Sequence, residues 1–369
     1  MALQGHEGGG RHVVSKAALL VIRADASEHI GSGHVMRCLS LAEEWASRGG
    51  AVIFLCRPLK GHLVPAIQER GFETRALSLG DAAPTWTAED QRADAWATRQ
   101  VLSELIHRSE GSAVWLLVDH YQLGAAWHEA VTQQGMWLAV LDDLANRTLK
   151  CDVLIDQNAL THLHLRYPAL TPAHCQRLLG ADYTLLRQDV VRAAKQRDHH
   201  AVRTVPVFMG GADREGLTQT VIDHWRRQVN REDLTAHVLC GAMNPHREGL
   251  KTACMQAQIS FSHAQRDMSA VLTQARAAIV ACGMLAVELQ ALEVPSLLIP
   301  LSDIQKAVAF DFEKRGRAVV LNPENLRDDD AFDSAWLRTL ALDYSYSGEG
   351  FIALDGARKV VNRLMEISS

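Results

Sequence analysis

Short apolar runs alternate with amphipathic stretches along most of this chain, and that alternation restricts the possible folds more than any other sequence feature. Four runs in the first half are typical of buried parallel strands: residues 18–22, 51–56, 114–118 and 136–141. After the first run, residues 34–46 carry apolar side chains at helical spacing and end at a Gly-Gly pair. Strands that alternate with helices predict βαβ units around a parallel sheet.

The same pattern restarts near residue 202, where an apolar strand runs into a glycine turn and a helix is expected over about 214–229. Residues 275–283 and 295–301 supply later strands. A length of 369 residues suits two domains at roughly 150 residues each. The sequence therefore predicts an α/β protein with two Rossmann-like lobes that face each other across a cleft.

The domain boundaries follow from this restart of the pattern. Residues 1–16 carry four glycines and no periodicity, so we expect a flexible N-terminal extension. The first lobe is expected over 17–200 and the second over 201–369. The last segment, 349–368, has the pattern of a closing helix.

Composition excludes several classes of protein. The formal net charge is −5, from 38 Lys and Arg against 43 Asp and Glu, which argues against nucleic-acid binding and against anionic membranes. Seven scattered cysteines without a CxxC pair argue against a disulfide framework and a structural zinc site. The longest apolar stretch, 277–287, is shorter than the roughly 20 residues of a membrane span. We expect a soluble cytoplasmic protein with a small-molecule ligand.

The segment IRADASEHIGSGHVMR, residues 22–37, is the first candidate site. A strand ends there, Gly31 and Gly33 form a turn, and His34 and Arg37 open a helix. Glycines allow a ligand to approach backbone N–H groups, and a helix N-terminus favours an anion. A neutral His34 at this position could accept a proton from water. The alternative is that His34 merely caps the helix, and the segment matches neither a P-loop nor a full dinucleotide fingerprint.

Two later strand ends also carry polar residues. The segment VDHYQLG, residues 118–124, presents Asp119, His120 and Tyr121 at the carboxyl edge of the sheet, where ligands bind. Asp119 could equally be an N-cap. The segment LDDLANR, residues 141–147, has paired acids that invite a metal hypothesis, but no third ligand has a recognisable spacing, and turn chemistry explains them better.

The second lobe offers two glycine turns between a strand and a helix. Gly210 and Gly211 form one, and Gly283 forms the other. Their backbone N–H groups could hold a diphosphate without basic side chains, which suits the acidic net charge. Glu288 could accept both hydroxyls of a ribose, and Gln305 faces the same cleft. The alternative is that Gly283 permits helix packing and Glu288 is solvated.

The order and spacing of these motifs resemble a known family. The matching segments are IRADASEHIGSGHVMRCLSLAEEW, LLVDHYQLGAAW, LDDLANRTLKCDVLIDQN, RYPAL with LLGADYTLLRQDV, FMGGAD and residues 283–305. They resemble the hydrolases that cleave UDP-2,4-diacetamido-2,4,6-trideoxy-β-L-altropyranose in pseudaminic acid biosynthesis. The likeness covers about 18–320 and weakens in the second half, which is only loosely similar to the UDP-sugar loop of the MurG-like glycosyltransferases.

This resemblance implies a GT-B-like pair of lobes and a hydrolysis that needs no metal and no cofactor. Water would attack the anomeric carbon with C–O cleavage and inversion, and the products would be UDP and the free sugar. The implied catalytic residues are His34, as base, and Tyr121. The implied substrate-binding residues are Asp25, Gly31, Gly33, Arg37 and Asn146. The implied nucleotide-binding residues are Gly210, Gly211, Gly283, Met284, Glu288 and Gln305. A monomer is preferred, since a cleft between two lobes needs no partner.

Overall fold

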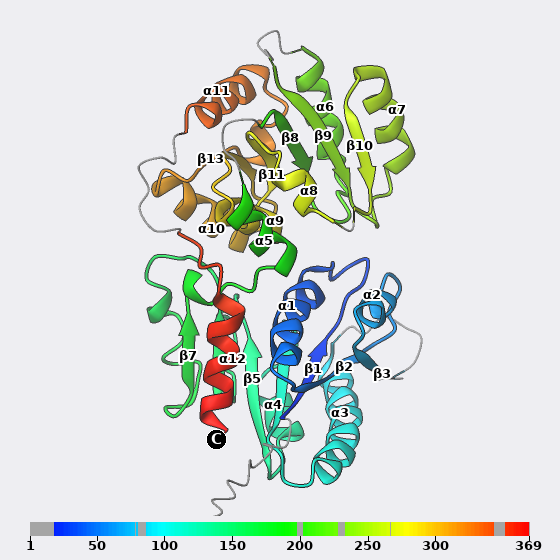
Figure 1. Ribbon diagram of the computed structural model, residues 1–369, viewed down its shortest axis with the longest axis vertical. Helices are drawn as coiled ribbons and strands as arrows, with labels where there is room; N and C mark the ends of the chain where they lie inside the picture. The colour runs from blue at the N-terminus through cyan, green and yellow to red at the C-terminus, as the bar shows by residue number, and fades with distance from the viewer. Residues whose placement is uncertain are drawn as a thin grey trace, which may run out of the picture.

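The computed structural model describes residues 18–77, 79, 86–197, 202–227, 233–265, 267–342 and 351–368. The expected extension at 1–16 lies outside the described residues. Two parallel sheets form two lobes, with the first lobe in the lower half of Figure 1 and the second in the upper half. The α/β prediction with two Rossmann-like lobes is confirmed.

The first sheet has seven strands in the order β3-β2-β1-β4-β5-β6-β7. All of its pairings are parallel. Its strands are β1 (Leu19–Ala24), β2 (Ala51–Cys56), β3 (Glu73–Ala76), β4 (Val114–Asp119), β5 (Met136–Leu141), β6 (Val153–Asp156) and β7 (Gln176–Leu179). The four runs predicted as strands became β1, β2, β4 and β5, whereas the short β3, β6 and β7 were not predicted.

The second sheet has six strands in the order β10-β9-β8-β11-β12-β13, again all parallel. Its strands are β8 (Thr204–Phe208), β9 (Thr235–Cys240), β10 (Ser260–His263), β11 (Ala278–Ala281), β12 (Ser296–Ile299) and β13 (Ala318–Val320). In both sheets the strand order reverses next to the first strand of the lobe, and ligands bind α/β sheets at the carboxyl ends beside such a reversal.

Helices cover both faces of each sheet, as the apolar sides of parallel strands require. Those that precede β8 are α1 (Gly33–Ser47), α2 (Val64–Glu69), α3 (Ala88–Arg108), α4 (Ala125–Val131) and α5 (Gln188–Gln196). Those that follow β8 are α6 (Leu217–Arg227), α7 (Arg247–Ala257), α8 (Ser269–Leu272), α9 (Met284–Ala291), α10 (Asp303–Lys314), α11 (Asp329–Leu340) and α12 (Gly356–Ile367). Short 3₁₀ turns lie at Leu163–Leu165, Ala181–Tyr183 and Pro323–Asn325.

Two helices pack on the lobe opposite to the one that the sequence assigned to them. Helix α5 lies before residue 200, yet Val190 and Val191 belong to an apolar cluster of the second lobe. Helix α12 lies after residue 201, yet Val360, Val361 and Leu364 belong to the core of the first lobe. Figure 1 shows α12, in red, beside α1 and β5. The predicted boundary near 200 therefore separates the two sheets but assigns both α5 and α12 to the lobe on which they do not pack.

The chain crosses between the lobes twice, and the two crossings touch. The backbone N–H of Ala353 donates to the carbonyl of Ala181 at 3.3 Å. Gly356, at the start of α12, lies so close to the other crossing that a Cβ there would be 2.2 Å from the carbonyl oxygen of Thr184. Only glycine allows this approach between the backbones.

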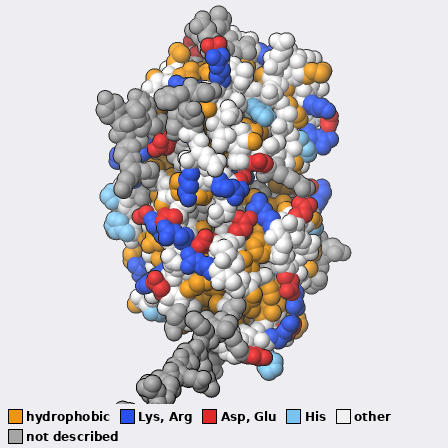
Figure 2. All heavy atoms as spheres, viewed as in Figure 1, with side chains coloured by type: hydrophobic (Ala, Val, Ile, Leu, Met, Phe, Trp, Pro, Cys, Tyr) orange, Lys and Arg blue, Asp and Glu red, His pale blue; other side chains and the backbone are white. Residues whose placement is uncertain are grey.

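The surface carries mixed charge on the face drawn in Figure 2, where acidic and basic side chains lie close together across the waist between the lobes. Lys359, in α12, pairs with Asp182 at 2.8 Å and with Asp355 at 3.3 Å. All seven cysteines are free and buried. Within the described part of the chain, no helix is long and apolar enough to span a membrane.

Candidate functional site

A cavity of about 240 Å³ lies between the two lobes and is lined by residues of both. His34, Tyr121, Asp143 and Asn158 reach it from loops and a helix that follow β1, β4, β5 and β6. Residues that follow β11 and β12 reach it from the other side. The carboxyl ends of both sheets thus converge on one cavity, which is where an α/β protein binds its ligand.

His34 owes its position to the loop between β1 and α1. The Ser27 Oγ accepts the backbone N–H of Ile30 at 3.0 Å, and the Gly31 N–H donates to the Ser27 carbonyl at 2.8 Å. Gly31 has a φ of +82°, a conformation that glycine adopts without strain. This tight loop ends the strand and starts α1 at Gly33, so His34 lies in the first turn of the helix and faces the cavity.

The His34 imidazole is held by a buried carboxylate. Its Nδ1 lies 2.5 Å from Oδ1 of Asp119, and the Asp119 side chain is fully buried. An ionised carboxylate can only accept hydrogen bonds, so Nδ1 carries the proton. In a neutral imidazole the other nitrogen, Nε2, is then a proton acceptor. The sequence allowed two roles for Asp119, a residue of the site or the N-cap of the next helix. In the structure it binds His34, and the N-cap of α4 is Gly124.

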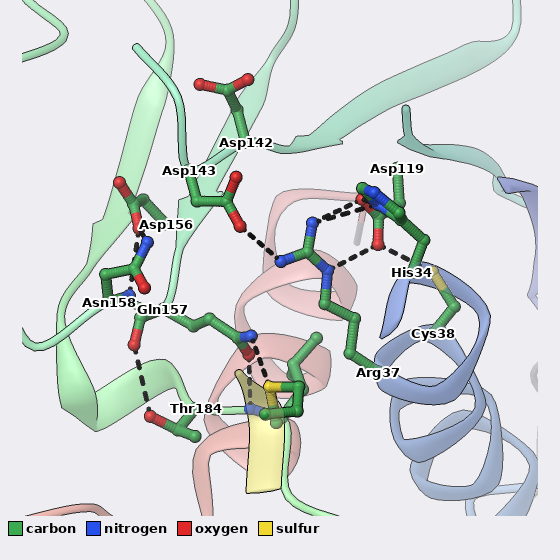
Figure 3. A network of polar contacts seen from close by, with 12 residues as sticks. His34, Arg37, Cys38, Asp119, Asp142, Asp143, Asp156, Gln157, Asn158 and Thr184 are labelled. Atoms are coloured by element: carbon green, nitrogen blue, oxygen red, sulfur yellow. Dashed lines mark hydrogen bonds and ion pairs between the residues drawn. The ribbon is translucent and has the colours of Figure 1, made fainter. Parts of the chain in front are cut away.

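Asp119 remains charged because Arg37 binds it with two nitrogens. The Arg37 Nε and Nη2 each lie 2.6 Å from an Asp119 oxygen, and Nη1 lies 2.9 Å from Asp143 (Figure 3). Burial opposes ionisation of Asp119, but the charges of Arg37 and His34 hold its pKa well below the usual range. Arg37 does line the cavity, but its charge is already matched by two carboxylates.

Tyr121 packs against the imidazole from the next loop. The two rings meet edge to face, with centroids 4.4 Å apart. Burial, together with the negative charge of Asp143, raises the pKa of Tyr121 above its ordinary value. The phenol therefore stays protonated and can donate a hydrogen bond. His34 and Tyr121, the two residues expected to be catalytic, lie side by side.

Gln157 and Asn158 complete the polar wall, and the sequence did not single them out. The Gln157 Oε1 accepts from the N–H of Leu185 at 2.9 Å, and its Nε2 lies 3.2 Å from Sδ of Met284 across the cleft. The Asn158 Nδ2 donates to Asp156 at 2.9 Å. Both residues directly follow β6, a buried run of only four residues. Ligand-binding residues commonly follow the carboxyl ends of parallel strands, and this principle, applied to the short run of β6, would have identified both residues.

The second lobe contributes the start of α9. Gly283 is its N-cap and makes no side-chain cap, so N–H groups of the first turn are left for a ligand. Gln305, in the first turn of α10, accepts the N–H of Leu301 at 2.8 Å through Oε1. The cavity is lined there by Gly283, Met284 and Gln305.

Glu288 differs from the sequence expectation. Its two carboxylate oxygens accept from Arg187 at 2.7 and 2.9 Å, and only 4% of the residue is exposed. Burial raises the pKa of Glu288, and Arg187 opposes this rise. Glu288 is not among the residues that line the cavity, so it does not offer a free carboxylate to a ribose. Arg187 lies 101 residues away in sequence, which is why the pattern could not reveal the pair.

Five other expected site residues lie outside the cavity lining. Asp25 is fully buried and pairs with Arg23 at 2.6 Å. Asn146 is exposed on the surface. Gly31, Gly210 and Gly211 shape loops at the strand ends without lining the cavity. The positive φ of Gly210, +89°, explains why glycine stands there.

No group of three or more His, Cys, Asp or Glu side chains that could hold a metal ion occurs in the described ranges. The groups that line the cavity and could act as metal ligands are one imidazole, one carboxylate, a phenol, a thiol and three amides, and the carboxylate already pairs with Arg37. Proton transfer and hydrogen bonding are the chemistry that this set offers.

Two curated proteins are similar to this chain in sequence. The chain is 26% identical, over 200 residues, to the UDP-2,4-diacetamido-2,4,6-trideoxy-β-L-altropyranose hydrolase of Campylobacter jejuni, across 54% of this chain and 62% of that protein. It is 28% identical, over 156 residues, to the spore coat polysaccharide biosynthesis protein SpsG of Bacillus subtilis, across 41% of this chain and 45% of that protein. The chain thus spans less than two thirds of either curated relative. No family model matches.

Solved structures show the same fold over nearly the whole chain. MurG of Acinetobacter baumannii superposes with a TM-score of 0.61 at 13% identity, covering 95% of this chain and 99% of its own. The calicheamicin glycosyltransferase CalG4 superposes with a TM-score of 0.57 at 12% identity, covering 95% and 98%. The chain has the GT-B fold, and it resembles both the hydrolase and the MurG-like proteins.

Proposed function

We propose that this protein is a nucleotide-sugar hydrolase that releases UDP and a free 2,4-diacetamido-2,4,6-trideoxy sugar. The observation that carries the proposal is the buried His34–Asp119 pair, which faces a cavity between two lobes of the GT-B fold. The similarity to the Campylobacter jejuni hydrolase supports the choice of reaction and substrate. The protein acts, on this proposal, on a UDP-sugar with no bound metal and no cofactor.

The proposed reaction needs one base and one stabilised leaving group. Nε2 of His34 takes a proton from water as the water oxygen bonds to the anomeric carbon. The bond between that carbon and the diphosphate oxygen breaks on the opposite face, so the configuration inverts. UDP leaves with the electron pair, and His34 later returns its proton to solvent. Asp119 keeps Nδ1 protonated and stabilises the imidazolium, as in other Asp–His pairs.

The second lobe would hold the leaving group. The uncapped first turn of α9, at Gly283 and Met284, presents backbone N–H groups to a diphosphate. UDP is already a good leaving group, so these donors need to stabilise only the charge that develops on it. Tyr121, with its protonated hydroxyl beside His34, would orient the water or the sugar ring.

Incubation of the purified protein with the UDP-sugar and no acceptor tests the proposal. We expect UDP and free sugar, with ¹⁸O from labelled water found in the sugar and not in UDP. His34→Ala should lower kcat by about 10²- to 10⁴-fold, the usual contribution of a general base. His107→Ala, an exposed histidine on α3, is the matched control. Absence of release from wild type, or His34→Ala as active as wild type, rejects the proposal.

A glycosyltransferase is the second candidate, favoured by the fold it shares with solved glycosyltransferases such as CalG4. In that case turnover would appear only after an acceptor is added, and His34 would deprotonate an acceptor hydroxyl instead of water. A non-catalytic nucleotide-sugar-binding protein would show tight UDP binding by calorimetry and no turnover of any UDP-sugar.

A further inference from the structure

Arg57 is a buried arginine whose side chain makes no hydrogen bond and no ion pair with any residue that the structure describes. It directly follows β2, and only 3% of the residue is exposed. A buried arginine is normally paired, because its charge and its five N–H donors are costly to remove from water. Arg57 therefore lacks the acceptor that its burial calls for.

An indole ring holds the Arg57 guanidinium in place. The Cζ of Arg57 lies 5.4 Å from the ring centroid of Trp86, a cation–π contact that uses no N–H donor. Trp86 has a φ of +57°, which is costly for a bulky residue. The ring of His120, with its centroid 4.2 Å away, and a hydrogen bond from Gln91 to the Trp86 carbonyl at 3.2 Å keep it there. Strained residues of this kind are typical of ligand sites.

Arg57 lies at the edge of the first sheet that faces the second lobe. It follows β2, the neighbour of β1 in the sheet. In the next turn of its loop, the carbonyl of Lys60 accepts the N–H of Glu28, between β1 and α1, at 3.0 Å. A Cβ at Gly61 would lie 3.3 Å from Sδ of Met243, in the second lobe. The loop that starts at Arg57 is thus part of the contact between the lobes, at the carboxyl ends of the strands, where α/β proteins bind ligands.

Two buried carboxylates near the backbone of Arg57 are already bound by another arginine. The backbone N–H of Arg57 donates to Asp25 at 2.8 Å, but both oxygens of Asp25 also accept from Arg23, at 2.6 and 2.8 Å. Asp94 accepts from Arg23 as well, at 2.6 and 3.3 Å. The surplus negative charge of this group can attract Arg57 at a distance, but it satisfies none of the N–H donors of the Arg57 guanidinium.

We propose that Arg57 is the centre of an oxyanion-binding subsite on the first lobe, and that its ligand is a phosphate group. A phosphate presents several acceptor oxygens to the guanidinium fork and supplies a negative charge that binds it directly. The exposed part of Arg57 includes its guanidinium nitrogens, which is where a phosphate would approach. The subsite is separate from the N–H groups at the start of α9, and it requires no hydrolysis. Its phosphate comes either from a nucleotide that spans both lobes or from a free ion.

Binding of inorganic phosphate, pyrophosphate and UDP to the purified protein, measured by calorimetry in a phosphate-free buffer, tests the subsite. Wild type should bind at least one of the three. Arg57→Met should weaken that binding about 10- to 100-fold, the effect of losing a charge-assisted hydrogen bond. Arg57→Lys keeps the charge without the planar fork and should bind several-fold more weakly than wild type. Arg108→Met, at an exposed arginine of α3 that pairs with Glu104, is the matched control and should bind as wild type does.

Stability separates a ligand-binding role from a structural one. Arg57→Met removes a buried charge that has no hydrogen-bond acceptor, so in the phosphate-free buffer it should melt at or above the wild-type temperature. A structural role, through Trp86 or through the charge of Asp25, would make the variant melt lower. In that case the folded Arg57→Lys decides: binding as tight as in wild type rejects the subsite, and weaker binding supports it.

Competition identifies the source of the phosphate. If UDP displaces inorganic phosphate and Arg57→Met weakens the binding of both, the diphosphate of a nucleotide occupies the subsite. If wild type still binds phosphate when saturated with UDP, and Arg57→Met does not, a separate ion occupies it. Both results support the subsite. If none of the three ligands binds, or none depends on Arg57, the subsite is rejected, and the proposed hydrolysis is unaffected because no turnover is measured.

Discussion

Asp119 is the residue on which the proposed chemistry depends most, because it binds both the base, His34, and the neighbouring Arg37. It accepts from His34 and twice from Arg37, and the Cys38 thiol lies 3.6 Å from its second oxygen. Removal of its charge would leave the Arg37 guanidinium against a neutral partner and free the imidazole to take either tautomer. Asp119 is thus a positioning residue that acts through His34.

Asp119→Asn should lower kcat by at least about a hundredfold with little change in KM, because the asparagine holds the imidazole weakly and in either tautomer. Steady-state kinetics of UDP release would measure this, with the fold checked by circular dichroism. Asp182→Asn, an exposed aspartate paired with Lys359, is the control and should retain full activity. A rise in KM with kcat intact would show that Asp119 serves binding instead.

Two buried histidines outside the cavity make the fold sensitive to acid. Burial, then the charge of Arg147, lowers the pKa of His128 to about 3. Burial, then the charge of Arg23, lowers the pKa of His120 to about 3. In the unfolded chain a histidine binds its proton near pH 6.5, so between these values the unfolded state holds more protons. Stability should therefore fall as the pH drops from about 6.5 toward about 3.

His128→Asn tests this dependence, because an asparagine oxygen can still accept the Lys150 N–H that His128 Nδ1 accepts at 3.2 Å. The variant lacks a side chain that binds a proton in the unfolded state and not in the folded state. The slope of unfolding free energy against pH should therefore drop by about 1.4 kcal/mol per pH unit in that window. Urea titrations at several pH values would measure it. The exposed His107→Asn should leave the slope as in wild type, and an unchanged slope in His128→Asn would contradict the assignment.

At the scale of helices and strands, the sequence was informative where a pattern is local. The runs at 51–56 and 136–141 matched β2 and β5 to the residue, because a buried parallel strand is one continuous apolar run. The position of His34 at the start of a helix was likewise predicted from the sequence, and it lies in the first turn of α1. The partner of Glu288 and the lobe on which α12 packs depend on contacts between distant segments, and no local periodicity encodes them.

Helix α12 should be required for the first lobe in particular. Leu364 is fully buried against that lobe's core, and α12 contacts α1. Leu364→Ala should cost about 2–5 kcal/mol through the cavity it leaves. Hydrogen exchange should quicken in α1 and β1 and remain unchanged in the second sheet. Leu337→Ala, on the exposed side of α11, should change neither lobe. Faster exchange in the second sheet, with α1 and β1 unchanged, would mean that α12 stabilises the second lobe and would contradict the prediction.

At the scale of the whole molecule, the volume of the cavity leads to an expectation about movement of the two lobes. About 240 Å³ is below the roughly 300–1,000 Å³ of pockets that enclose drug-sized ligands, and a UDP-sugar is at least that large. If the proposed function is correct, we therefore expect the lobes to part when a UDP-sugar binds. Contacts that cross the cleft hold them together: Arg214 donates to the Glu28 carbonyl at 3.0 Å, and the Thr161 hydroxyl donates to Asp311 at 2.5 Å.

Arg214→Ala should make UDP association and dissociation both faster by about three- to tenfold, the effect of losing one or two hydrogen bonds of ordinary strength, with Kd nearly unchanged. Stopped-flow fluorescence would measure both rates. Arg247→Ala, which pairs with its neighbour Glu248 inside the second lobe, should leave both rates as in wild type. A faster dissociation alone would show that Arg214 contacts the nucleotide directly.

The placement of α12 also sets an order for biosynthesis. The ribosome makes the strands of the first lobe, then every strand of the second, and only then α12. The second lobe can therefore fold as a continuous segment, since domains generally fold as units during synthesis. Until α12 has been synthesised, the apolar face of α1 that it covers remains exposed to solvent. The half of the molecule that is begun first is completed last, and during that interval it is the half open to chaperones and proteases.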